Sequence, residues 1–133
     1  MLFRSALNPE RIKLSISTVP FLSDFPNYFK VGNWPANEFK DYVKNNQKIS
    51  WDKIYKTLSY FDIKNLATLV KCPVYMSVGL FDGVCPPRIN FAMYNNLKPE
   101  KKYQVSPLDG HGLAGSYIKN TWQWVEEKWE IGN

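Results

Sequence analysis

Alternating apolar and polar positions predict three short strands in this sequence. From Ile12 to Val19, apolar residues alternate with lysine, serine and threonine until Pro20 ends the run. Two later runs contain valine and tyrosine, and each is followed by turn-forming residues. The strands are therefore expected at 12–19, 74–80 and 102–106.

Between the first two strands, apolar residues recur at helical spacing. Segment 21–72 is predicted to be a helical insert, in which Ser50 and Asp62 can each cap a helix by accepting hydrogen bonds from first-turn amides. The first part of the insert, Phe21 to Asn33, is expected to form a loop or broken turns because it contains proline, glycine and asparagine.

Two more helices are predicted after the second and third strands, at 86–97 and 113–130. Strands separated by helical crossovers favour a parallel α/β sheet with helices on its faces. The residues that these two helices are expected to bury are Ile89, Met93, Trp122, Val125 and Trp129. Three parallel strands are few for such a sheet, so residues 1–133 are expected to be the C-terminal half of a larger, doubly wound domain.

Composition and charge exclude several classes of protein. A chain of 133 residues with 44% hydrophobic and 22% charged residues is ordinary for one globular domain, which excludes a disordered chain and a coiled coil. The net charge of +5 comes from scattered lysines rather than a basic stripe, so we expect no nucleic-acid partner. No apolar run reaches the roughly 18 residues of a membrane span, so we expect no membrane partner either.

The cysteines and the single histidine limit the available chemistry. Cys72 and Cys85 are too few for a disulfide framework and lack metal-ligand spacing, and His111 alone cannot build a histidine-based zinc site without carboxylates. Both thiols are expected to be small buried or half-buried side chains. They favour a reducing compartment, and we expect a cytoplasmic location.

Two loops at the ends of neighbouring strands carry residues suited to catalysis. Asp82 follows the second predicted strand, and His111 lies in the loop after the third. Parallel neighbours end at the same edge of a sheet, where a carboxylate beside an imidazole orients it for proton transfer near neutral pH. Simpler interpretations stay open: Asp82 can form a turn or cap a helix, and His111 can be a plain loop residue. Asp109, before Gly110, is expected to be a turn former.

Four stretches of the sequence carry a resemblance to a known family. They are Val19–Phe25, Lys56–Ala67, Met76–Asp82 with the following Pro86-Pro87, and Gly110-His111. Together they resemble the acetyl xylan esterase / cephalosporin C deacetylase family of α/β-hydrolases from about Ala6 onwards. The resemblance implies that Asp82 is the acid and His111 the base of a Ser-His-Asp triad. It also implies that the complete enzyme removes acetyl groups from acetylated xylo-oligosaccharides or similar small acetyl esters, with no metal or organic cofactor.

The sequence departs from the family's pattern at the nucleophile. No G-x-S-x-G motif is present, and the nearest similarity, Ser77-Val78-Gly79, lacks the first glycine and lies inside a predicted strand. In the family, the elbow serine lies just before the segment that resembles Ala6 to Glu10. The chain is therefore expected to begin after that serine, to lack the oxyanion hole as well, and to be inactive alone. A second departure is Gly112, where the family commonly has glutamate, and it bears on the rigidity of the histidine loop.

The strand at 12–19 predicts a partner. In the family's sheet this strand pairs with the nucleophile strand, so its edge is expected to mediate self-association or pairing with a missing N-terminal half. Two other functions remain open. One is a non-catalytic interaction or oligomerisation module that uses the aromatic segment from Phe21 to Trp51. The other is a small α/β domain for an anionic ligand, although it lacks a glycine-rich phosphate loop.

Overall fold

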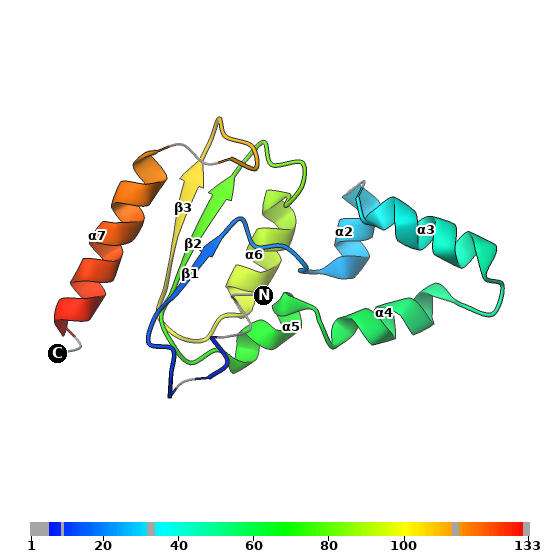
Figure 1. The fold of residues 1–133 in the computed structure, drawn as a ribbon, viewed down its shortest axis with the longest axis horizontal. Coiled ribbons are helices and arrows are strands. Elements are labelled where there is room, and N and C mark those ends of the chain that lie inside the picture. Colours follow the sequence, from blue (N-terminus) through cyan, green and yellow to red (C-terminus); the bar gives the residue numbers. More distant parts are fainter. Residues whose placement is uncertain (1–5, 9, 32–33, 113–114, 132–133) are drawn as a thin grey trace.

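The sheet consists of three parallel strands in the order β1 (Ser15–Thr18), β2 (Val74–Gly79) and β3 (Lys101–Ser106) (Figure 1). This computed structural model describes residues 6–8, 10–31, 34–112 and 115–131. The register places Met76 between Ser17 of β1 and Tyr103 of β3. The expected α/β architecture, about three parallel strands with flanking helices, is confirmed.

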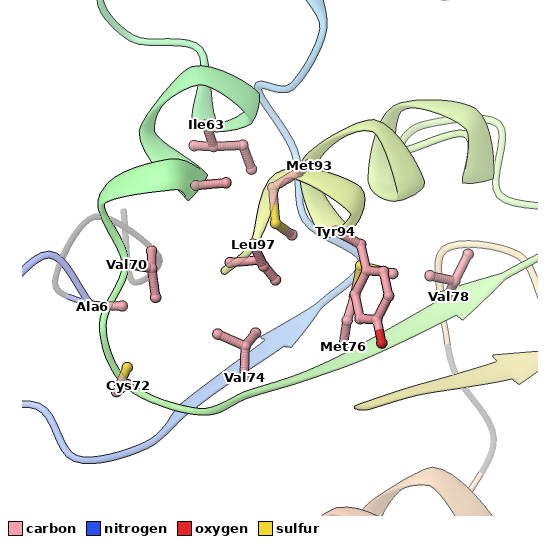
Figure 2. Packing of buried hydrophobic residues seen from close by; sticks show 11 residues of the cluster. Ala6, Ile63, Val70, Cys72, Val74, Met76, Val78, Met93, Tyr94 and Leu97 are labelled. Carbon is pink, nitrogen blue, oxygen red and sulfur yellow. The ribbon is translucent and has the colours of Figure 1, made fainter. Parts of the chain in front are cut away.

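The main core lies between β2 and the helices on one face of the sheet (Figure 2). These helices are α5 (Ile63–Leu66), the short 3₁₀ turn η1 (Ala67–Leu69) and α6 (Pro87–Asn96). The buried residues of this core are Ala6, Ile63, Ala67, Val70, Cys72, Val74, Met76, Val78, Met93, Tyr94 and Leu97. Every residue of β2 is buried, as is typical of a central parallel strand covered on both faces.

Helix α7 (Ser116–Ile131) lies on the opposite face of the sheet (Figure 1). Its Trp124 is 2% exposed, and the centre of its ring is 5.4 Å from that of Tyr75. The expectation that Trp122 and Trp129 are buried is wrong, because they are 59% and 61% exposed. A residue two positions from Trp124 lies about 200° around the helix from it, so the face that packs on the sheet turns Trp122 away. Val125 is half-buried.

The helical insert forms an arm beside the sheet (Figure 1). Its helices are α2 (Phe25–Val31), α3 (Ala36–Asn45) and α4 (Trp51–Ser59). The expectation of a loop over 21–33 is wrong for α2, whose Phe25, Tyr28 and Phe29 are buried at helical spacing. Burial of these rings outweighs the local turn signals, and Pro26 lies in the first turn, where proline is tolerated.

Aromatic side chains make a second core inside the arm. The ring of Phe29 lies 5.1 Å from Phe39, 5.7 Å from Trp51 and 6.0 Å from Tyr55, measured between ring centres. Much of the aromatic segment from Phe21 to Trp51 therefore packs within the arm. Trp34 stacks on Phe21, with ring centres 6.2 Å apart, but remains 62% exposed, and Tyr42 is 52% exposed.

Asp62 joins the arm to the sheet layer. Its buried carboxylate caps α5 by accepting from the Lys64 amide at 2.9 Å. The same carboxylate accepts from the backbone amides of Asp24 at 2.9 Å and Phe25 at 3.1 Å. These bonds hold the connection from β1 to α2, in which Leu22 and Asp24 have φ values of 63° and 50° that residues other than glycine rarely adopt. The cap expected at Asp62 is thus confirmed.

The other expected cap, Ser50, accepts from the Lys53 amide at 3.3 Å and begins α4. Some element bounds differ from those predicted. The strand expected at 12–19 is the shorter β1, and α6 spans Pro87–Asn96 rather than 86–97. The last helix begins at Ser116; its expected start at 113 lies outside the described residues. Among the described residues, the helices are too short or too polar to cross a membrane.

Candidate active site

The loops that follow β2 and β3 come together at one edge of the sheet. Gly79, the last residue of β2, pairs with Ser106 of β3, and the amide of Phe81 then donates to the carbonyl of Asp109 at 3.0 Å. A Cβ atom added to Gly79 would lie 2.3 Å from the carbonyl oxygen of Gly110 and 2.6 Å from that of Asp109. Only glycine permits this close approach, which brings the histidine loop against the end of β2.

Asp82 sits in the loop between β2 and α6 with its carboxylate fixed on both oxygens. Oδ1 accepts from the amides of Val84 at 2.8 Å and Cys85 at 2.7 Å. Oδ2 lies 3.0 Å from Nδ1 of His111, and the Asp82 side chain is fully buried. A buried carboxylate needs such partners, because removing a charge from water without them is costly.

His111 approaches this carboxylate from the loop after β3. Its side chain is 51% exposed, whereas that of Asp82 has no exposure at all. When Nδ1–H donates to the carboxylate, Nε2 is left as a proton acceptor. The arrangement can therefore take up a proton at Nε2 while the carboxylate stabilises the imidazolium that forms. The structure brings together the two residues that the sequence analysis singled out.

Cys85 completes a group of three potential metal ligands with Asp82 and His111. One ligand atom from each lies within 4.8 Å of the others, in the single such cluster found among the described residues. Both carboxylate oxygens, however, are already in hydrogen bonds to protein donors. Burial, with a further contribution from the charge of Asp82, raises the pKa of the Cys85 thiol to about 12. A protonated thiol beside a satisfied carboxylate fits an acid–base pair better than a metal centre.

Tyr28 of the arm reaches the same region. Burial raises the pKa of its phenol, and the negative charges of Asp82 and of Cys85, when that thiol is ionised, raise it further. Its hydroxyl donates to the carbonyl of Trp34. Sequence analysis did not assign Tyr28 or Cys85 to the site; the only available signal was that Cys85 lies three residues after Asp82.

Asp109 and Gly112 flank His111 in the loop after β3. The amide of Asp109 donates to the carbonyl of Ser106 at 3.3 Å, in keeping with the predicted turn. The carbonyl of Asp109 accepts a hydrogen bond from the amide of Phe81. Gly112 is exposed, and a Cβ atom added there would meet nothing within 4 Å.

Comparisons with solved structures show that these elements recur in larger proteins. The acetyl xylan esterase 1 of Thermoanaerobacterium sp. JW/SL YS485 is 32% identical, with a TM-score of 0.81 over 92% of this chain and 40% of that chain. The acetyl xylan esterase of Paenibacillus sp. R4 is 28% identical, with a TM-score of 0.86 over 95% of this chain and 41% of that chain. The α/β-hydrolase fold class, as a partial sheet, is thus confirmed.

A sequence relative agrees with the solved structures. The acetyl esterase Axe7A of Xylanibacter ruminicola is 26% identical over 130 residues, which are 96% of this chain and 28% of that protein. The chain thus spans about two fifths of the two solved esterases and a smaller share of Axe7A. Residues 1–128 match the acetyl xylan esterase (AXE1) family. Since this match takes in nearly the whole chain, the protein belongs to the acetyl xylan esterase family.

Proposed function

We propose that this chain supplies the acid and the base of an esterase that deacetylates acetylated xylo-oligosaccharides or similar small acetyl esters. The observation that carries the proposal is the 3.0 Å contact between Asp82 Oδ2 and His111 Nδ1 at the carboxyl edge of a parallel sheet. Membership of the acetyl xylan esterase family supports the choice of an acetyl ester as the substrate.

The proposed mechanism uses a serine from a part of the domain outside these 133 residues. Nε2 of His111 takes the proton as the serine oxygen attacks the acetyl carbonyl, and Asp82 stabilises the imidazolium. His111 then returns the proton to the leaving alcohol, which leaves an acetyl-serine. A water molecule, deprotonated by His111, attacks this ester, and His111 returns that proton to the serine oxygen as acetate leaves.

Two parts of the catalytic machinery, the nucleophilic serine and the oxyanion hole, are not supplied by these 133 residues in the proposed mechanism. The sequence has no G-x-S-x-G motif, and in α/β-hydrolases the amide after that serine is one donor of the oxyanion hole. Each oxyanion donor contributes about 3–4 kcal/mol to transition-state stabilisation. We therefore expect that the isolated chain does not hydrolyse p-nitrophenyl acetate above the buffer rate. Turnover that is lost in both Asp82→Ala and His111→Ala would contradict this.

The roles of the two residues are tested in a hybrid enzyme. Residues 6–133 of this chain replace the matched part of the Thermoanaerobacterium acetyl xylan esterase 1, and circular dichroism establishes that the hybrid is folded. Asp82→Asn and His111→Ala are expected to lower kcat by about 10³-fold or more with little change in KM, because both act in the transition state. Asp52→Asn, an exposed aspartate on α4, is the matched control. A hybrid that keeps its kcat in either site variant refutes the assigned roles.

A further inference from the structure

The loop between β2 and α6, which carries Asp82, depends on side chains to hold its backbone (Figure 1). The amides of Val84 and Cys85 are both committed to Oδ1 of Asp82, at 2.8 Å and 2.7 Å. Pro86 and Pro87 come next, and proline has no amide hydrogen to donate. The carbonyl of Cys85, a residue that is 1% exposed, therefore needs a donor from beyond the loop, because a buried carbonyl without a hydrogen bond is costly.

Asn90 of α6 provides that donor. Its Nδ2 atom donates to the carbonyl of Cys85 at 2.6 Å and to that of Pro86 at 3.0 Å. Both neighbours are carbonyl oxygens, so the NH2 group and not the amide oxygen of Asn90 must face them. The backbone amides of Ile89 and Asn90 donate to Pro86 as well, at 3.0 Å and 3.4 Å. Cys85 is thus held at both of its backbone polar groups, its amide by Asp82 and its carbonyl by Asn90.

Asn90 makes these bonds at an energetic cost. The residue is 0% exposed, and its Oδ1 atom has no hydrogen-bond partner within the part of the chain that the structure describes. Its neighbours on α6, Ile89 and Met93, are buried apolar residues of the two cores. Burying an unpaired amide oxygen lowers stability, so the benefit of asparagine here comes from the two bonds that it donates to the loop.

We infer that Asn90 is a positioning residue for the Asp82–His111 pair. By holding the carbonyls of 85 and 86, it holds the amides that fix Oδ1 of Asp82, which keeps Oδ2 aimed at Nδ1 of His111, 3.0 Å away. Without the Asn90 donor, the loop relaxes and the bond from Nδ1–H to the carboxylate weakens. The neutral imidazole then carries its proton more often on Nε2, and in that form Nε2 cannot accept the proton of a serine. The catalytic consequence rests on the proposed function, whereas the positioning rests on the hydrogen bonds alone.

NMR of the full 133-residue chain tests this inference, with ¹⁵N-labelled histidine and no histidine tag. His111 is the only histidine in the sequence, so its ring nitrogens give the only imidazole signals. At alkaline pH, where imidazole is neutral, the two ¹⁵N shifts show how the proton is shared between Nδ1 and Nε2. We expect the proton mainly on Nδ1 in the unaltered chain. In Asn90→Leu, whose side chain has nearly the same shape but no donor, the ratio of Nδ1–H to Nε2–H is expected to fall about tenfold or more, because bonds to a carboxylate are among the stronger hydrogen bonds.

Met93→Ala is the matched control for a loss of stability. Met93 is 0% exposed in α6, three residues after Asn90, and packs in the main core. Its truncation is expected to lower the urea concentration at which the chain unfolds and to leave the ratio of the two tautomers unchanged. Asn90→Ala removes the donor without adding an apolar group, and it carries the test if leucine does not fit the site. Circular dichroism establishes that each variant is folded.

Three results would overturn the inference. One is an unaltered chain whose histidine carries its proton mainly on Nε2. Another is an unchanged tautomer ratio in the folded variants of Asn90. The third is an equal fall of the ratio in Met93→Ala, which would show that any loss of stability separates the pair.

Activity separates this inference from the proposed function. In the hybrid with the Thermoanaerobacterium esterase, Asn90→Leu is expected to lower kcat about 10- to 100-fold and to change KM by less than about twofold, because the misplaced pair acts in the transition state. A lower tautomer ratio with an unchanged kcat supports the positioning role and contradicts the catalytic role that the proposed function gives to the pair.

Discussion

A methyl group added at Gly79 is expected to separate Asp82 from His111. The new Cβ atom would lie 2.3 Å from the Gly110 carbonyl oxygen, whereas ordinary contacts begin near 3.4 Å, so the backbone at 109–110 must retreat by about 1 Å. The retreat carries His111 away from a contact that is now 3.0 Å, to a separation beyond hydrogen-bond range. Overpacking costs about 1–3 kcal/mol and the weakened bond from Phe81 to Asp109 about 1 kcal/mol, so Gly79→Ala should lose about 2–4 kcal/mol of stability.

Urea unfolding measures this loss, and NMR of ¹⁵N-labelled histidine reports on the His111 Nδ1–H donor. Gly83→Ala is the matched control, because a Cβ atom at Gly83 meets nothing within 4 Å. Its stability is expected to change by no more than about 0.5–1 kcal/mol. If Gly79→Ala unfolds at the same urea concentration as Gly83→Ala and keeps the Nδ1–H signal, the close approach at Gly79 does not position the histidine loop.

Three more predictions concern the supports of the site. Asp62→Ala removes a buried acceptor of three backbone amides and should lower the free energy of unfolding, measured in urea, by about 2–4 kcal/mol. Its control, Ser50→Ala, removes one exposed cap and should lower that free energy by about 1 kcal/mol or less. Equal losses in the two variants would contradict the role of Asp62 in anchoring the arm. Burial alone would raise the pKa of Asp24, but hydrogen bonds from Asn27 and Lys64 and nearby positive charges outweigh it and hold that pKa below 3.8. The stabilisation from Asp24 is thus present above about pH 4 and lost as the pH falls through the lowered pKa, so Asp24→Asn should flatten the loss of stability between about pH 4 and pH 2; an unchanged acid limb would refute this. Because the thiol of Cys85 is buried with a pKa of about 12, it should not react with a thiol-specific disulfide reagent at pH 8 until the protein unfolds; fast labelling of the folded chain would show that it is accessible.

Local sequence patterns were enough to predict the elements whose stabilising hydrogen bonds and side-chain alternation involve residues close together in the chain. Strands lie within the predicted runs, β1 (Ser15–Thr18) inside 12–19 and β2 (Val74–Gly79) inside 74–80. Ser50 and Asp62 begin helices by accepting hydrogen bonds from amides three and two residues further on. Helix α2 was missed because its stability depends on Phe25 and Phe29 packing in the arm. Proline and asparagine dominate the local signal, while burial against distant residues decides the structure.

The sequence by itself placed Asp82 and His111 after two strands joined by a crossover, and parallel strands of one sheet end at the same edge. The contact between the two side chains comes from the structure. Only the tertiary structure decided which neighbours that pair has and how closely the loops approach. Gly79 leaves room for the carbonyls of 109 and 110. It also decided that Trp122 and Trp129 face a groove rather than the sheet, since helical spacing shows that they share a stripe but not which face of the helix packs. That choice depends on contacts between residues far apart in the chain, such as Tyr75 and Trp124.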